Sequence, residues 1–218
     1  MKHSQKIGNL RNSRNSSIKR KNLSKRMYSS VLIVCEGENT EINYFKGLIS
    51  KLRIQTNVDV KTTVRGSSPD NVLNSARKVY CKNNDYDFVF CVFDKDRHDK
   101  YQETLEALQA KAFQKYKAAN SVPCFEFWLL LHHKFTTAPC YSSKDPVQKV
   151  INQLKEFDPS YSKADTQDFS EYYKLTEKAI LNATKVLDEA SQNGTDDPST
   201  HVHELVLFLK ELSSKINN

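Results

Sequence analysis

Three acidic residues with the chemistry of metal ligands follow two apolar runs of the chain. The run VLIVC ends at Glu36, and the run FVFCVF ends at Asp94 and Asp96. Asp94 and Asp96 are two residues apart, so their side chains point the same way if the backbone stays extended that far. Two carboxylates aimed at one point repel each other unless a cation lies between them. A solvated turn is the ordinary explanation of a single Asp-x-Asp pair, and it stays open here.

Both apolar runs predict strands that are buried on both faces of a parallel sheet. After the first strand, Ile42, Phe45 and Leu48 follow at helical spacing, so the acidic turn at residues 36–38 lies between a strand end and a helix start. Open α/β sheets bind their ligands at such points. A carboxylate there either caps the helix or holds a cation, and the turn alone does not decide between them.

Further elements complete an alternation of strands and helices. Residues 58–64 predict a second strand near a sheet edge, and residues 118–125 a short strand or extended connection. Ser68 and Pro69 predict the start of a helix. The other predicted helices are marked by apolar residues at helical spacing over residues 105–116, 126–133, 147–154, 175–190 and 202–216.

Chain topology predicts that the acids meet. With parallel strands and right-handed crossovers, the ends of the first and third strands can lie side by side at one edge of the sheet. Glu36, Asp94 and Asp96 would then share a crevice, and Mg²⁺, with Mn²⁺ as the alternative ion, is the natural occupant of such an oxygen-rich site. Glu126 leads an apolar helix and needs a partner, so it either caps that helix or faces the same crevice.

Composition indicates a soluble protein of one compact body. The 218 residues suffice for one good core. Five widely spaced cysteines without a Cys-x-x-Cys pair favour reduced thiols over a disulfide frame or a zinc site. No apolar stretch approaches the roughly 18 residues of a membrane span, and no secretory segment precedes the first strand. We therefore expect a cytoplasmic protein that has no membrane partner.

The net charge of +7 is concentrated at the start of the chain. Residues 1–30 carry nine Lys and Arg and no acid, which leaves 24 basic and 26 acidic residues in the remainder. An arm over residues 1–29 with so few apolar residues is predicted to be disordered. Such arms often contact nucleic-acid phosphates, and a merely solubilising arm is the alternative. The basic residues expected to bind nucleic acid are Lys19, Arg20, Lys21, Lys25 and Arg26.

Four segments resemble the signature segments of the RloB family: CEGENTEINYF (35–45), FDKD (93–96), VPCFEFWLLLH (122–132) and DPSTHVHELV (197–206). The resemblance implies an α/β fold with a Toprim-like, mostly parallel sheet flanked by helices. In Toprim proteins, a Glu after the first strand and an Asp-x-Asp after the third bind metal and act on phosphodiesters. We accordingly divide the chain into the arm at 1–29, a Toprim-like core at 30–133, and a helical C-terminal extension at 134–218 that packs on the core.

Carried over by position, Glu36 matches the Toprim glutamate, and Asp94 and Asp96 match the metal-binding pair. Glu38, Glu41 and Glu126 match further family acids whose roles are less certain. The resemblance implies a Mg²⁺-dependent endonuclease that hydrolyses phosphodiesters in RNA such as tRNA, or in DNA. It also implies an effector role in bacterial antiphage defence and abortive infection, with an AAA-type ATPase as partner protein. Where the family more usually has Pro after the acid that corresponds to Glu41, this chain has Ile42.

Other classes of protein share parts of this pattern. A receiver-like domain needs an acidic pair after the first strand and a single Asp after the third, and here the acids are distributed the other way. A P-loop is excluded because Gly37-Glu38-Asn39-Thr40 lacks the phosphate-binding lysine. The remaining alternative is a non-catalytic Toprim-like module that binds nucleic acid or a partner ATPase.

Overall fold

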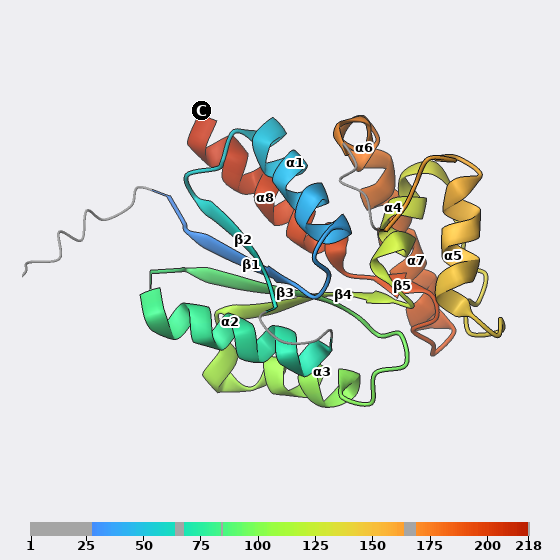
Figure 1. The fold of residues 1–218 in the computed structure, drawn as a ribbon, viewed down its shortest axis with the longest axis horizontal. Helices are drawn as coiled ribbons and strands as arrows, with labels where there is room; N and C mark the ends of the chain where they lie inside the picture. Colours follow the sequence, from blue (N-terminus) through green and yellow to red (C-terminus); the bar gives the residue numbers. More distant parts are fainter. Residues whose placement is uncertain (1–27, 64–67, 84, 164–168, 218) are drawn as a thin grey trace, which may run out of the picture.

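A computed structural model describes residues 28–63, 68–83, 85–163 and 169–217. The five basic residues expected to bind nucleic acid, Lys19 to Arg26, lie outside these ranges. Within them, the chain forms a central sheet with helices on both faces and a further group of helices beyond one end (Figure 1).

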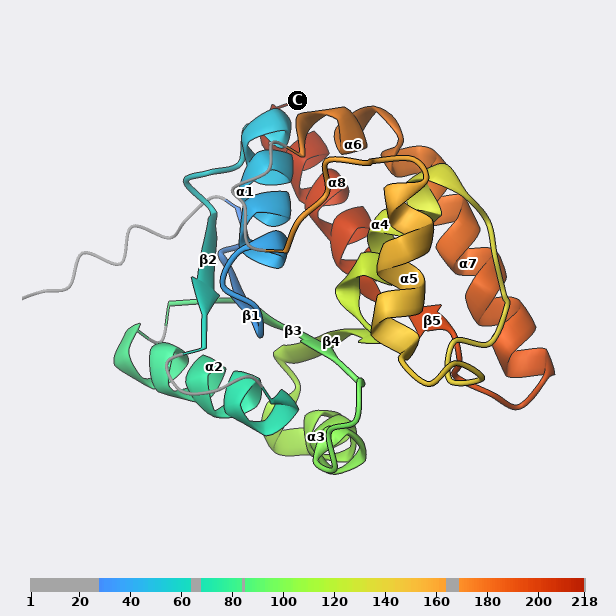
Figure 2. The same ribbon diagram turned by 45° about the vertical axis from the view of Figure 1, so that its right-hand side comes forward.

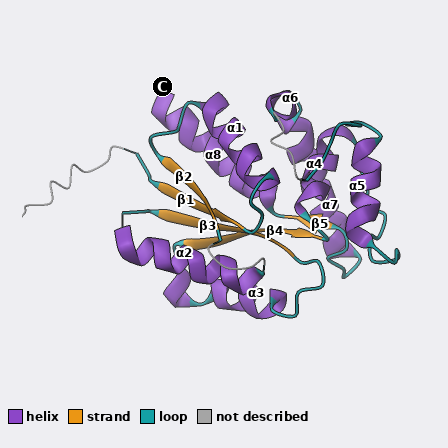
Figure 3. Ribbon diagram, viewed as in Figure 1, coloured by secondary structure: helices purple, strands orange, loops and turns teal. Residues whose placement is uncertain are grey.

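The sheet contains five strands in the order β2-β1-β3-β4-β5 (Figure 3). Their bounds are β1 Val31–Cys35, β2 Val58–Thr62, β3 Phe88–Asp94, β4 Tyr116–Val122 and β5 Ser199–Thr200. The first four strands are parallel, and β5 pairs antiparallel with the last two residues of β4. Because β1 pairs directly with β3, the predicted meeting of the two strand ends is confirmed, and β2 lies at the sheet edge as expected.

Helices cover both faces of the sheet. α1 (Thr40–Leu52) and α8 (Val202–Asn217) lie on one face, and α2 (Pro69–Asn83) and α3 (Tyr101–Gln109) on the other (Figure 1). The remaining helices gather beyond the carboxyl ends of the strands (Figure 2): α4 Phe125–His133, α5 Pro146–Lys155, α6 Ser170–Lys174 and α7 Thr176–Gln192. The prediction of a mostly parallel sheet flanked by helices, with further helices in the C-terminal part, is confirmed.

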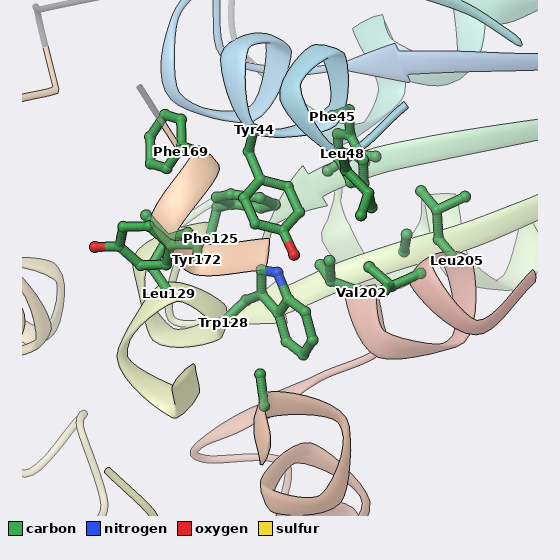
Figure 4. Close-up of a cluster of buried hydrophobic side chains, with 14 of the residues drawn as sticks. Tyr44, Phe45, Leu48, Phe125, Trp128, Leu129, Phe169, Tyr172, Val202 and Leu205 are labelled. Atoms are coloured by element: carbon green, nitrogen blue, oxygen red, sulfur yellow. The ribbon is translucent and has the colours of Figure 1, made fainter. Parts of the chain in front are cut away.

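The core is divided by the sheet into two apolar clusters. Alternate residues of β1 point to opposite faces: Val31 and Ile33 pack with α1 and α8, whereas Leu32 and Val34 pack with α2. The larger cluster extends into the helices beyond the sheet and holds the single Trp128, which is fully buried (Figure 4). Aromatic side chains of α1 and α4 interlock there and join these helices to the end of the sheet.

The structure differs locally from the elements predicted from the sequence. The helix predicted over 105–116 ends at Gln109; Ala112 lies in a short 3-10 turn, η1 (Lys111–Phe113), and Tyr116 begins β4. Pairing of β4 with β3 outweighs the helical spacing of these apolar residues. The short strand β5 and the short helix α6 were not predicted, whereas α8 begins at Val202 as expected. Within the described residues, no helix is long and apolar enough to cross a membrane.

Candidate functional site

A polar crevice of about 310 Å³ lies where the carboxyl ends of β1 and β3 meet the N-terminus of α1. It is the expected position for a ligand site in an open parallel sheet. All six acids singled out from the sequence line it: Glu36, Glu38, Glu41, Asp94, Asp96 and Glu126.

Glu36 is held between two elements at the floor of the crevice. Its Oε2 accepts a hydrogen bond from the backbone N–H of Asp94 at 3.1 Å, and its Oε1 lies 3.2 Å from Nε2 of His98. The side chain is 8% exposed. The hydrogen bonds found for Glu36 therefore lead to the turn after β3, whereas the capping interpretation required them at the start of α1.

Asp94 and Asp96 reach the crevice by a different backbone path from the expected one. β3 ends at Asp94, and Asp96 has a left-handed conformation with φ of 33°. The backbone N–H of Asp96 donates to the carbonyl of Pro123 at 3.0 Å, which fixes the turn. The condition that the strand stays extended through Asp96 is thus not met, although both side chains line the same cavity.

Glu41, in the first turn of α1, holds the loop that precedes the helix. Its carboxylate accepts a hydrogen bond from the N–H of Gly37 at 3.2 Å, and its side chain is buried. The Asn39 side chain, at the N-cap position, makes no capping hydrogen bond. A Cβ atom at Gly37 would lie 2.1 Å from Oε2 of Glu41, so any larger residue here would displace the Glu41 carboxylate from its present position.

Glu126 faces the crevice from the first turn of α4. Its Oε1 accepts hydrogen bonds from the Tyr161 hydroxyl at 2.7 Å and from the Lys163 ammonium at 3.0 Å. Its Oε2 is buried and has no hydrogen-bond partner among the described residues. The Tyr161 hydroxyl also lies 3.3 Å from Oγ1 of Thr40, which connects the segment before α6 to the start of α1.

Three acids of the crevice, Glu36, Glu41 and Asp94, have raised pKa values. Burial, and then the charges of Glu41, Glu126 and Glu36, raise the pKa of Asp94 well above its ordinary value. Burial also raises the pKa of Glu36, although the Asp94 N–H and His98 oppose the shift. Burial and the charge of Glu126 raise the pKa of Glu41 to about 7, against the opposing backbone N–H groups. A cation in the crevice would stabilise all three carboxylates.

Lys163 already supplies one positive charge. Burial lowers the pKa of its ammonium, but the Glu126 carboxylate outweighs this and raises the pKa above the ordinary value of lysine. The side chain is about half exposed, so its other two N–H donors can turn toward the cavity. Lys163 therefore offsets part of the acidic charge and remains accessible from solvent.

Sequence reasoning assigned no role to three residues of this site. His98 could have been found, because it follows Asp94 by four residues in the same turn. Tyr161 and Lys163 lie in an irregular segment far from the acidic motifs in the sequence, and no local pattern marks them. Only the tertiary fold brings them to Glu126.

The donor chemistry of the crevice fits a hard divalent cation. Its donors are carboxylate oxygens, the pKa values of Glu36 and Asp94 are raised, and one buried oxygen of Glu126 lacks a partner among the described residues. Within the described part of the chain, no three His, Cys, Asp or Glu side chains are grouped as a ready-made metal site. Mg²⁺ commonly takes only one or two protein carboxylates and keeps waters or phosphate oxygens, so a preformed group of three is not required.

The fold and the crevice define an α/β protein whose acidic site lies at the carboxyl edge of a parallel sheet. Residues 31–209 match the family described as RloB-like protein, and the chain therefore belongs to the RloB-like family. The match includes every acid of the crevice and leaves out the basic arm. No curated protein and no solved structure matches the chain.

Proposed function

We propose that this protein is a Mg²⁺-dependent endonuclease that hydrolyses phosphodiester bonds in RNA such as tRNA, or in DNA. The observation that supports it most is the convergence of Glu36, Asp94 and Asp96 in one crevice at the carboxyl edge of the sheet. These are the positions that match the Toprim acids in the resemblance to the RloB family.

Glu36 is the residue we assign to proton transfer. Burial raises the pKa of Glu36 above its ordinary value, which makes its carboxylate a better proton acceptor. The Asp94 N–H and the His98 ring fix the orientation of its two oxygens. Proton transfer by a positioned side chain typically contributes 10²–10⁴ in rate.

Asp94 and Asp96 would hold the metal, with Glu36 as a third contact. Mg²⁺, or Mn²⁺ in its place, would supply positive charge to offset the charge that develops on the phosphate and the leaving oxygen. Lys163 adds a fixed positive charge at the crevice, where its ammonium contacts Glu126 and can turn toward a phosphate oxygen. A phosphodiester would otherwise meet only like charge from the carboxylates.

The biological setting of the proposal comes from the family resemblance. We infer an effector in bacterial antiphage defence and abortive infection, kept inactive until an AAA-type ATPase partner engages it. An unrestrained nuclease would harm its own host, so expression of this chain alone should be tolerated. Rapid degradation of bulk RNA or DNA by the isolated protein, with lethality on expression, would contradict this regulated role.

The proposal is tested by incubating purified full-length protein with RNA and with DNA in Mg²⁺, Mn²⁺ or EDTA, alone and with a candidate AAA-type ATPase partner. Cleavage that requires the metal and is lost in Glu36→Gln supports the nuclease. The alternative is a non-catalytic module that binds nucleic acid or the ATPase. It predicts binding without cleavage under every condition, including the complete complex, and that result would overturn the enzymatic proposal.

A further inference from the structure

The acidic crevice cannot by itself accommodate a polynucleotide. If a phosphodiester enters beside six carboxylates, the phosphates next to it along the strand also need positive charge. A metal at the acids offsets charge at one phosphate only. Basic side chains immediately beside the crevice, and free of acidic partners, are therefore the groups to look for.

A second cavity adjoins the crevice through Asp96. It measures about 350 Å³, and Asp96 lines both spaces. Arg97 and Lys144 lie on its walls, together with the first turn of α5. One guanidinium nitrogen of Arg97 donates to the carbonyl of Lys144 at 2.7 Å, which ties the turn after β3 to the loop before α5.

The backbone around this cavity is well anchored. Besides the bond from Asp96 to Pro123, the hydroxyl of Tyr141 donates a hydrogen bond to the Asp96 carbonyl. The Asp145 carboxylate accepts the N–H of Gln148 at 2.9 Å and caps α5. Of the two acids in the cavity wall, Asp145 is thus engaged with its own helix, and Asp96 belongs to the crevice.

Arg97 and Lys144 differ from the neighbouring Lys95 in having no anionic partner. The Lys95 ammonium is paired with the Asp196 carboxylate at 2.6 Å. Arg97 and Lys144 are exposed, and neither forms an ion pair with an acid in the described ranges. Their positive charges are available to a ligand.

We propose that Arg97 and Lys144 form a phosphate-binding subsite for the phosphate that neighbours the reacting phosphodiester in a bound polynucleotide. This inference rests on the proposed nuclease function. Arginine can bind two phosphate oxygens through its planar fork, and lysine adds a mobile point charge. Arg97 follows Asp96 directly in the chain, and Asp96 lines both cavities. A polynucleotide that contacts the acids of the crevice therefore continues into the adjoining cavity.

The test measures binding of a fluorescent single-stranded oligonucleotide to the full-length chain over a range of salt concentrations. All proteins carry Glu36→Gln, so that the oligonucleotide stays intact. Arg97→Gln and Lys144→Gln should each lower the slope of log affinity against log salt by about 0.7, and the double variant by about twice that. Lys144→Arg should keep the slope, which separates charge from local structure. Each variant's melting temperature checks its fold.

Matched controls remove the same charges elsewhere. Lys82 in α2 and Lys185 in α7 are exposed and do not line either cavity. The double control Lys82→Gln/Lys185→Gln should change the slope clearly less than Arg97→Gln/Lys144→Gln. Equal effects of the two pairs, or an unchanged slope in the subsite variants, overturn the subsite.

A small substrate separates this subsite from the nuclease proposal. With Glu36 intact, bis(p-nitrophenyl) phosphate offers a single phosphodiester and no neighbouring phosphate. If wild-type protein cleaves both substrates, Arg97→Gln/Lys144→Gln should keep its rate on this ester and lose at least tenfold on the oligonucleotide. An equal loss on both substrates overturns the subsite and leaves the nuclease in place. The salt slope of oligonucleotide binding could change only in the subsite variants while the wild-type protein cleaves neither substrate. That result would support the subsite and count against the nuclease.

Discussion

The carboxylate of Glu36, at the end of β1, accepts a hydrogen bond from the backbone N–H of Asp94, at the end of β3, at 3.1 Å. This bond continues the pairing of the two strands beyond the last partners in register, Cys35 and Val92. One oxygen of Glu36 thus contacts the backbone of Asp94, and the other lies against His98. The position of Glu36 is therefore set by the sheet itself.

Replacing Glu36 with Gln should separate structure from chemistry. The amide oxygen of Gln can still accept the Asp94 N–H, so we expect a folded protein that binds nucleic acid with nearly unchanged affinity. Cleavage should fall by 10² to 10⁴ or more, because the proton-transfer group is lost. If the role of Glu36 were that of a helix cap, the variant would lose about 1 kcal/mol of stability and keep its activity. A folded Glu36→Gln protein that cleaves at the wild-type rate contradicts the catalytic assignment.

Asp94 should control the response of the protein to Mg²⁺. Metal binding to the native state relieves repulsion among the acids and stabilises the fold by mass action, by about 2.7 kcal/mol when Mg²⁺ is at 100 times its Kd. Asp94→Asn should remove much of this rise in melting temperature. Asp188→Asn on the exposed side of α7 is the matched control and should retain it. Identical Mg²⁺ shifts in both variants would exclude Asp94 as a ligand.

The raised pKa of Glu41 predicts how stability depends on pH. Its pKa is about 7 in the folded protein, against an ordinary value of 4.5, so the folded state binds the proton more tightly than the unfolded state. The resulting stabilisation is complete below about pH 4.5 and is lost as pH rises through 7, by at most roughly 3 kcal/mol. Glu41→Gln should flatten this decline in chemical denaturation measured at a series of pH values. The raised pKa values of Glu36 and Asp94 act in the same direction and leave a residual slope.

Mg²⁺ should oppose the same decline, because it favours the ionised carboxylates and competes with their protons. Denaturation repeated with saturating Mg²⁺ should therefore show a shallower loss of stability between pH 4.5 and 7. If the stability of Glu41→Gln fell with rising pH as steeply as that of the wild-type protein, groups other than Glu41 would cause the pH dependence.

The parts of the fold that could be predicted from the sequence are those set by local pattern. Apolar runs such as residues 88–93 predict buried strands, and acids that follow parallel strands lie at one edge of the sheet. Tyr116 was assigned to a helix because it continues the helical spacing of the apolar residues before it. Pairing with β3 places it in β4 instead. β5 is only two residues long and depends on the end of β4. Lys163 reaches Glu126 through tertiary structure that no short segment encodes.

The ion pair between Lys163 and Glu126 can be measured by a double-mutant cycle. Lys163→Met leaves the buried Glu126 without its cation and should cost about 1–2 kcal/mol, since the exposure of Lys163 weakens the pair through screening by solvent. Glu126→Gln on its own removes the charge but keeps an acceptor for Tyr161. The double variant should be more stable than the sum of the single losses predicts. Additive losses in urea denaturation would show that the pair contributes nothing.

The basic arm gives the last prediction. Residues 1–27 hold nine Lys and Arg and no acid, and they lie outside both the described structure and the family match. If the arm contacts phosphates, each contact adds roughly 0.7–0.9 to the slope of log affinity against log salt. Deleting residues 1–27 should therefore weaken binding of RNA or DNA at low salt and flatten that slope by several times this amount.

Neutralising two different sets of basic residues in the arm distinguishes contact by specific residues from general electrostatic attraction. Neutralising Lys19, Arg20, Lys21, Lys25 and Arg26 to Gln in the full-length chain removes more than half of the arm's positive charge and keeps its length. This variant should reproduce most of the slope change seen on deletion, whereas neutralising the other four basic residues should have the smaller effect. Melting temperatures should be alike in all three proteins if the arm adds nothing to the core. A deletion that leaves the slope unchanged would make the arm a solubilising segment only.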